Sequence, residues 1–169
     1  MAEQTPDLPE TVNHFFEGLV EILGEPNANL FLTSQQAVQS DPQTRGILIK
    51  AGRAGFYYWL RKNLDAMGWN DPMFRLRPVK KKIASGLKDI CQHLEKETKQ
   101  ALSLEDSPKI WQITISGASE SLPCSYIWGF VQEYTRWAGN GRFYEVREKS
   151  CSLNGNSQCE LVIKKEPQD

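Results

Sequence analysis

Three cysteines and one glutamate in the C-terminal part of the chain have the residue types and the spacing to hold a metal ion. They are Cys124, Glu148, Cys151 and Cys159. Zn²⁺ takes thiolate sulfur and carboxylate oxygen in tetrahedral sites, and four protein ligands with no open position make such a site structural. The spacing is not that of a zinc finger. The alternative is three small buried cysteines, and the residues alone leave both interpretations open.

The elements that carry these four residues would direct them to one side. A helical period places Cys124 in the first turn of an apolar helix, after Pro123 and before a Gly-Asn-Gly stop at 139–141. An alternating strand then ends its apolar row at Glu148, and a last strand places Cys159 on an aliphatic face. A carboxylate at the end of a buried row costs several kcal/mol unless it is paired or bound to a cation.

The order of these features resembles the C-terminal half of the 4-vinyl reductase domain. The matching features are the cysteine that opens an apolar helix, the strand GRFYEVRE, and a C-x7-C pair followed by a short apolar strand. That family includes a protein of bacteriochlorophyll synthesis and the aromatic-sensing domains of phenol- and xylene-responsive regulators. Its fold is similar to that of TRAPP trafficking subunits and haem nitric-oxide-binding domains. In the sensor branch the matching positions bind zinc, so the resemblance, which covers residues 108 to 164, implies structural zinc on Cys124, Glu148, Cys151 and Cys159.

The composition is that of an ordinary soluble domain. A chain of 169 residues is long enough for one full core. A net charge of -1 argues against general nucleic-acid binding. With no apolar run of about 18 residues and a polar, acidic N-terminus without signal-peptide features, we expect a cytoplasmic protein. Cysteines in that compartment are more often thiols or metal ligands than disulfides.

The N-terminal residues predict a helix that ends at Gly24. Its apolar stripe comprises Val12, Phe15, Phe16, Leu19 and Leu23. This stripe can pack on the same chain or on a second copy, and we predict a homodimer or related heterodimer through the N-terminal helices. His14 lies beside the stripe and is interpreted as a hydrogen-bonded surface or boundary residue rather than a ligand.

Residues 25 to 41 leave a short strand and a packed loop as equal alternatives. From Pro42 to about Met67 a helical pattern resumes. Gly52 and Gly55 lie inside it, at a cost of roughly 1 kcal/mol each relative to alanine. The close approach of another backbone or of a ligand would explain them.

Four aromatic residues are candidates to line a pocket for an apolar small molecule. They are Phe56, Trp59, Trp111 and Trp128, which the helix and strand periods direct inward. The alternative is that these rings fill a solid core.

A second long helix is predicted from Val79 to about Leu102, with Cys91 near its apolar stripe as a buried or half-buried thiol. The chain's basic residues concentrate here: Arg75, Arg77, Lys80, Lys81, Lys82 and Lys88. We interpret them as a solvated face, with an anion or partner contact as the alternative.

The predicted strands are 108 onward, 142–149 and 158–164, with a helix at 123–139 between the first two. This order predicts an α+β domain with helices on one face of an antiparallel sheet. The whole chain, 1–169, forms one domain. It divides into an N-terminal helix (1–24), a helical half (42–102), a sheet and metal-motif half (108–164) and a tail (165–169).

Enzyme motifs are missing: the sequence has no G-x-G-x-x-G, P-loop, G-x-S-x-G or H-E-x-x-H. Binding is therefore favoured over catalysis, and no catalytic residue is proposed. The leading hypothesis is an accessory or assembly protein of pigment synthesis or photosystem biogenesis that binds an aromatic compound or a tetrapyrrole. The alternatives are a dimerising scaffold without ligand, in contact with a membrane-protein complex, and a vinyl reductase of chlorophyll synthesis.

Overall fold

A computed structural model describes residues 10–38, 41–98, 100–116, 122–150 and 158–168. Its helices are α1 (Glu10–Leu23), α2 (Glu25–Val38), α3 (Pro42–Asn63), α4 (Pro72–Arg75), α5 (Val79–Thr98) and α6 (Cys124–Ala138). Its strands are β1 (Ala101–Asp106), β2 (Ile110–Ser116), β3 (Val146–Ser150) and β4 (Cys159–Lys164). The predicted α+β class, with helices on an antiparallel sheet, is confirmed.

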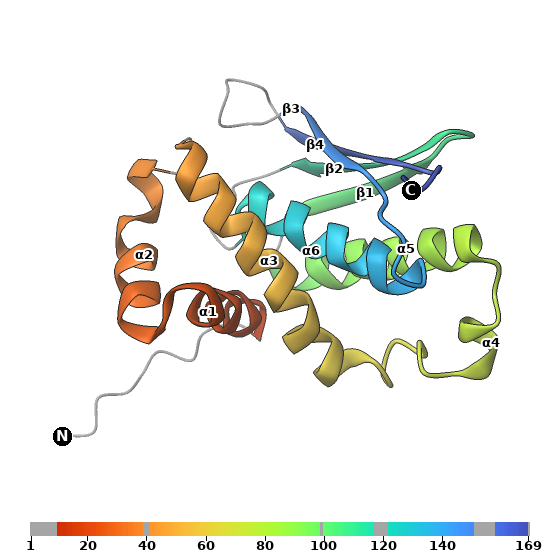
Figure 1. Ribbon diagram of the computed structural model, residues 1–169, viewed down its shortest axis with the longest axis horizontal. Coiled ribbons are helices and arrows are strands. Elements are labelled where there is room, and N and C mark those ends of the chain that lie inside the picture. The colour runs from red at the N-terminus through yellow and green to blue at the C-terminus, as the bar shows by residue number, and fades with distance from the viewer. Residues whose placement is uncertain (1–9, 39–40, 99, 117–121, 151–157, 169) are drawn as a thin grey trace.

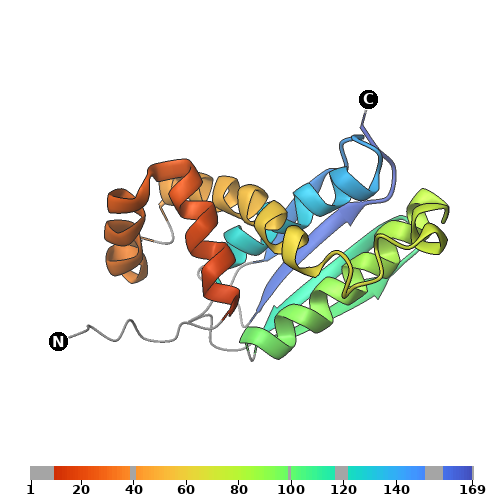
Figure 2. The same ribbon diagram turned by 90° about the horizontal axis from the view of Figure 1, so that it is seen from below.

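The sheet has the order β1-β2-β4-β3, and each neighbouring pair is antiparallel. Alternate residues of its two central strands are buried, including Trp111 and Ile113 on β2 and Leu161 and Ile163 on β4. This period-two burial is that of a sheet with one face on a core. Helices α5 and α6 lie against the sheet, and α3, α1 and α2 lie farther out (Figures 1 and 2).

Local sequence explains most helix ends. The carboxylate of Asp41 accepts a hydrogen bond from the Thr44 amide at 3.2 Å, and Pro42 stands in the first turn of α3. Gly24, with φ of 80°, ends α1 in the left-handed region that glycine adopts without strain.

Helix α3 crosses α6 with two glycines at the contact. A Cβ on Gly52 would overlap the carbonyl oxygen of Tyr126, and one on Gly129 would overlap the carbonyl oxygen of Ile49. The prediction that Gly52 marks the close approach of another backbone is therefore confirmed.

Three sequence predictions need correction. The segment 25–41 contains helix α2, which neither of the two alternatives anticipated. The helix predicted to reach Leu102 ends at Thr98, and the Leu-Ser-Leu alternation after it forms the edge strand β1. Helix α3 ends at Asn63 rather than near Met67.

The stripe of α1 packs on its own chain. Phe15 and Leu19 are buried, and Gly18 lies against the backbone of Ala51 on α3. We predicted a dimer because the apolar stripe of α1 would otherwise be exposed. Since the stripe is buried within one chain, this reason is weaker, and the dimer stays a prediction. None of the described helices is long and apolar enough to cross a membrane.

Candidate functional site

Three of the four predicted metal ligands, Cys124, Glu148 and Cys159, lie where the first turn of α6 meets β4 and β3. Cys124 and Cys159 are brought together from elements 35 residues apart in sequence, with a Cα–Cα distance of 6.6 Å, and are joined as a disulfide. Both cysteines are buried. The prediction that these helix and strand positions meet is confirmed, whereas the expectation of free thiols or thiolate ligands differs from the observed cross-link.

Glu148 reaches a basic partner that the sequence did not indicate. Its Oε1 accepts a hydrogen bond from the Arg45 guanidinium at 2.6 Å, and its side chain is only 10% exposed. The second oxygen, Oε2, is buried without a partner among the described residues. The guanidinium supplies the positive charge that a buried carboxylate needs, so a cation is not required to explain Glu148.

Cys151, the fourth predicted ligand, lies outside the described residues. Within the described ranges, no group of three His, Cys, Asp or Glu side chains is placed to hold a metal ion. The zinc site therefore stays a prediction, and the disulfide and the Arg45 ion pair are the arrangement that the described residues form.

Of the four aromatic residues predicted to line a pocket, only two lie close to each other. Phe56 and Trp59 are fully buried, with ring centroids 6.4 Å apart. In the described part of the chain, no ring contact joins either of them to Trp111 or Trp128. None of the four lines a described cavity. Trp111 instead contacts the Lys165 ammonium, 5.1 Å from its ring centroid.

A cluster of polar side chains with buried atoms, between α1, α3 and α5, was not predicted. It comprises His14, Glu17, Trp59, His93 and Glu97, and we call it the interhelical polar cluster. His14 and Trp59 are buried, whereas 36% of the Glu17 side chain, 20% of His93 and 15% of Glu97 are exposed. Each of these side chains has a buried polar atom with no hydrogen-bond partner among the described residues: His14 Nε2, Glu17 Oε2, Trp59 Nε1, His93 Nε2 and Glu97 Oε2. An unsatisfied buried donor or acceptor costs about 1–3 kcal/mol. His93 Nε2 has the Glu97 carboxylate 2.5 Å away, which leaves four such atoms in one region that need an explanation.

Contacts connect the members of the cluster. The rings of Trp59 and His93 lie 5.2 Å apart, edge to face. His93 Nε2 lies 2.5 Å from Glu97 Oε1 but without hydrogen-bond alignment. Glu17 lies 3.9 Å from the Lys62 ammonium. Both Glu17 and Glu97 act electrostatically on the Tyr126 hydroxyl and raise its pKa, second to the effect of burial.

His14 is buried and anchors the cluster. Its Nδ1 lies 2.6 Å from the Tyr126 hydroxyl. Burial, followed by the charges of His93 and Lys62, lowers the pKa of His14 from 6.5 to about 3, so the imidazole is neutral at physiological pH. Burial also holds Tyr126 protonated. When its hydroxyl donates to Nδ1, the ring proton of His14 is on Nε2, and when Nδ1 carries the proton and donates instead, Nε2 is an acceptor. The placement of His14 at the surface or boundary was wrong, although its hydrogen bond was expected.

The cluster thus offers both donors and acceptors. Trp59 Nε1 is an N–H donor, His14 Nε2 is a donor in the tautomer in which Tyr126 donates to Nδ1, and the carboxylate oxygens of Glu17 and Glu97 are acceptors. Among the described residues these side chains form no group of three placed to hold a metal ion. Their atoms are too dispersed for one ion, which suits hydrogen bonding to a molecule or to water.

The sequence carried a weak signal for this cluster. Each of the two histidines has a glutamate one helical turn further on, His14 with Glu17 and His93 with Glu97, and such pairs share a helix face. That the two faces oppose each other depends on how α1, α3 and α5 pack.

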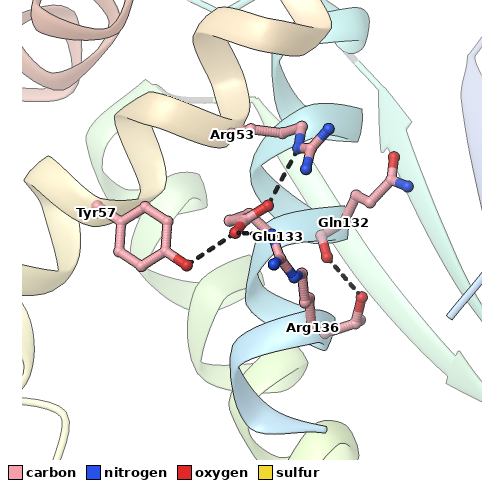
Figure 3. A network of polar contacts seen from close by, with 6 residues as sticks. Arg53, Tyr57, Gln132, Glu133 and Arg136 are labelled. Atoms are coloured by element: carbon pink, nitrogen blue, oxygen red, sulfur yellow. Dashed lines mark hydrogen bonds and ion pairs between the residues drawn. The ribbon is translucent and has the colours of Figure 1, made fainter. Parts of the chain in front are cut away.

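A second buried carboxylate, Glu133 on α6, is fully satisfied (Figure 3). It accepts hydrogen bonds from Arg53 Nε at 3.1 Å and the Tyr57 hydroxyl at 2.8 Å, both on α3, and from Arg136 at 3.4 Å. Because both of its carboxylate oxygens accept hydrogen bonds, Glu133 ties α3 to α6. It therefore has a structural role, unlike the interhelical polar cluster.

No family model and no curated protein matches the chain, so its membership of the 4-vinyl reductase family is not shown. Solved structures do match over nearly the whole chain. An H-NOX protein from Shewanella oneidensis in its Fe(II)NO state has a TM-score of 0.64 and 12% identity, covering 96% of this chain and 100% of that one. An NMR structure of an H-NOX domain from the same organism in its Fe(II)CO state has a TM-score of 0.61, 14% identity, and coverage of 96% and 99%.

A trafficking protein particle complex subunit 3 from Naegleria fowleri, covalently bound to palmitic acid, has a TM-score of 0.51 and 14% identity. The match covers 95% of this chain and 99% of the subunit. At these identities the likeness shows the fold alone. The chain has the fold shared by H-NOX domains and this trafficking subunit.

Proposed function

We propose that this protein is a binding domain for a small hydroxylated aromatic molecule, held at the interhelical polar cluster between α1, α3 and α5. The observation that carries the proposal is the set of four buried polar atoms without a partner among the described residues: His14 Nε2, Glu17 Oε2, Trp59 Nε1 and Glu97 Oε2. A ligand oxygen that accepts from the Trp59 and His14 N–H groups, and a hydroxyl that donates to a carboxylate, would satisfy them. Beside these atoms, His93 Nε2 contacts Glu97 Oε1. The surrounding rings of Phe56, Tyr126 and Phe130 suit an aromatic body.

The residues do not fit a haem, the tetrapyrrole suggested by the H-NOX likeness. The chain has two histidines, and no described cavity is lined by either of them or by another member of the interhelical polar cluster. Any ligand there has to displace packed side chains, and a macrocycle has to displace many more of them than a single ring. His14 has the rings of Tyr126 and Phe130 at 5.8 and 5.7 Å, and His93 has Trp59 at 5.2 Å. Neither imidazole therefore faces a slot for a macrocycle. Among the two classes of ligand that the sequence suggested, this favours the small aromatic over the tetrapyrrole.

Calorimetric titration of the full chain with catechol, phenol and toluene tests the proposal. A site built around hydrogen bonds rejects the analogue that lacks them, so we expect catechol and phenol to bind and toluene to bind at least tenfold more weakly. Trp59→Phe, which removes one donor and keeps an aromatic ring, should weaken phenol binding. Trp128→Phe, in a part of α6 without ring contact to Trp59, is the matched control. Equal binding of toluene and phenol, or no binding at all, would contradict the proposal.

We also propose that structural zinc binds at Cys124, Glu148, Cys151 and Cys159, in place of the Cys124–Cys159 disulfide. Support comes from the meeting of Cys124 with Cys159 and the unpartnered Glu148 Oε2. Zinc would supply a cross-link between α6 and the sheet, with its binding energy appearing as folding energy.

Elemental analysis and the intact mass of the denatured, unreduced chain distinguish the two states. Zinc binding predicts one zinc per chain and the mass of a fully reduced protein. A mass lower by two hydrogens without zinc would leave the disulfide as the cross-link and overturn the zinc proposal.

A role in pigment synthesis or photosystem biogenesis remains the proposed cellular setting, supported by the sequence resemblance. The absorbance spectrum of protein purified from a pigment-making host tests it. Porphyrin bands would favour a tetrapyrrole ligand and count against the small aromatic one. A colourless protein that co-purifies with a membrane complex would favour the scaffold alternative.

A further inference from the structure

The three consecutive lysines of the basic cluster have different surroundings. Lys80 is exposed and pairs with Glu166 at 3.1 Å, and Lys81 is exposed. Lys82 is only 8% exposed, and its side chain has no ion pair or hydrogen bond with the residues that the structure describes. Its ammonium is not among the buried unpartnered atoms, so the stem is buried and the charged end is accessible. Lys82 is therefore the member of this run whose charge is held in a fixed place and is free for a ligand.

Lys82 lines a depression of about 310 Å³ between α4, the first turn of α5 and the end of α6. The other lining residues are Phe74, Arg75, Trp137, Ala138 and Asn140. No acidic side chain is among them. Helix α4 lies at the end of the molecule opposite α1 and α2 (Figure 1). The depression is connected to the interhelical polar cluster by packed rings, since Trp69 lies 5.5 Å from Trp59 and 5.6 Å from Trp137.

The lining combines positive charge with flat apolar surface. The Arg75 guanidinium uses one N–H to reach the Asn70 side-chain oxygen at 2.5 Å, and a guanidinium has five donors in all. The Trp137 ring is half-buried, with Phe74 nearly parallel to it at 6.4 Å and an interplanar angle of 23°. The depression therefore offers an ammonium and a guanidinium beside an indole ring.

The charges in the first turn of α5 also favour an anion in this depression. The first turn of a helix carries a partial positive charge that favours anions. The first turn of α5 contains no acidic residue and instead begins the lysine run. An oxyanion in the depression would interact favourably with the Lys82 ammonium and with the first turn of α5, which carries it.

We propose that this depression binds the carboxylate or phosphate of a small aromatic anion, with Lys82 and Arg75 on the oxyanion and the Trp137 ring against the aromatic body. The site shares no residue with the interhelical polar cluster, although Trp137 contacts the Phe56 ring beside that cluster, with ring centroids 6.2 Å apart.

Calorimetric titration with phenyl phosphate, benzoate and inorganic phosphate, at physiological ionic strength, tests the proposal on the full chain. Phenyl phosphate should bind more tightly than inorganic phosphate, because only the former contacts Trp137. Lys82→Met keeps the apolar stem and removes the charge, and we expect it to weaken phenyl phosphate at least tenfold. Lys81→Met removes the same charge from an exposed neighbour and should leave the affinity within twofold of wild type.

Arg75→Gln, at an exposed position, is a second variant in case Lys82→Met fails to fold, and it should also weaken phenyl phosphate. Equal losses of phenyl phosphate affinity in Lys81→Met and Lys82→Met would mean that the anion is attracted by the overall positive charge, and the proposed site would be wrong. The absence of binding to wild type would also overturn the site. A third outcome is that phosphatidylglycerol vesicles bind in a Lys82-dependent way and phenyl phosphate does not bind. The ligand would then be a lipid headgroup, and the proposal of a small aromatic anion would be wrong. Phenol affinity measured on Lys82→Met should match wild type, which separates this site from the proposed function.

Discussion

His14 is the residue whose protonation most directly opposes folding. Burial lowers its pKa from 6.5 to about 3 in the folded protein, whereas in the unfolded chain it titrates near 6.5. The unfolded state therefore binds a proton in this interval and the folded state does not. The stability from neutral His14 is fully present above pH 6.5 and is lost as the pH falls toward 3, by up to about 1.4 kcal/mol per pH unit.

Urea unfolding of wild type and His14→Gln at pH 7.5, 6.5 and 5.5 measures this contribution. Glutamine does not titrate, so the free energy of unfolding of the variant should fall less steeply below pH 6.5. Parallel pH dependences for the two proteins would show that His14 is protonated in the folded state.

Cys91 should be unreactive in the folded protein. It is buried, and burial, followed by the charge of Glu95, raises its pKa to about 12, while the thiolate is the reactive form. We expect no alkylation of Cys91 by iodoacetamide at pH 8, and complete alkylation in denaturant, as read by peptide mass mapping. Labelling of the native protein at this position would contradict its described burial. Cys91→Ser should change stability by no more than about 1 kcal/mol.

Side-chain partners were the least predictable feature at this scale. The sequence indicated that Cys124, Glu148 and Cys159 face the core, because strand and helix periods determine which way a side chain points. It did not indicate that Arg45, 103 residues before Glu148, would neutralise the carboxylate. The same limit applies to His14 and Tyr126, 112 residues apart, whose pairing exists only once α1 and α6 have packed on α3.

At the scale of secondary-structure elements, the close crossing of α3 and α6 predicts that alanine at its glycines destabilises the protein. A Cβ at Gly52 or Gly129 would overlap a backbone carbonyl of the facing helix, and backbone cannot yield as a flexible side chain can. We expect Gly52→Ala and Gly129→Ala each to lower the free energy of unfolding by at least about 2 kcal/mol, measured by denaturant titration.

Gly46→Ala is the control within the same helix α3. A Cβ at Gly46 meets nothing within 4 Å, so alanine should stabilise by about 0.5–1 kcal/mol through helix propensity and reduced unfolded-state entropy. Opposite signs for Gly46→Ala and Gly52→Ala would support the close crossing. Stabilisation by all three alanines would show that the helices do not approach as described.

Elements with a strong period were predictable, and those without one were not. The apolar stripe of α1, the face of α6 and the alternation of β2 and β4 were identified from the sequence because each buries one continuous face. Helix α2 was missed since its polar residues leave little amphipathic pattern, and β1 was missed because two leucines in alternation were absorbed into the end of α5. Both lie at the edge of the structure, where burial constrains the sequence least.

At the scale of the whole molecule, the order of helices and strands was enough to predict the class of fold. Helices before a strand, then a helix and a hairpin, leave few arrangements that bury every apolar face. The likeness to H-NOX domains and to a trafficking subunit agrees with that class. The position of the candidate site was not predictable, because the interhelical polar cluster needs three helices from separate parts of the chain to converge.

The surface of α1 that remains exposed in one chain limits how the protein could form a dimer through this helix. Since Phe15 and Leu19 are buried within one chain, dimerisation through α1 would have to use its remaining surface, where Ile22 is 38% exposed. Light scattering at micromolar concentration checks the predicted dimer. If α1 contributes the contact, Ile22→Glu should shift a dimer toward a 19.3 kDa monomer. A monomeric wild type would contradict the dimer without bearing on the ligand site.

The central claim is that the indole N–H of Trp59 hydrogen-bonds a ligand within the interhelical polar cluster. Titration of ¹⁵N-labelled protein with phenol, followed through the tryptophan indole signals, tests it most directly, with the Trp59 signal assigned by its loss in Trp59→Phe. We predict that this signal shifts downfield and saturates with phenol while that of Trp128 stays in place, and that toluene leaves both unchanged. A Trp59 signal that does not move at saturating phenol, or moves equally with toluene, would contradict the account.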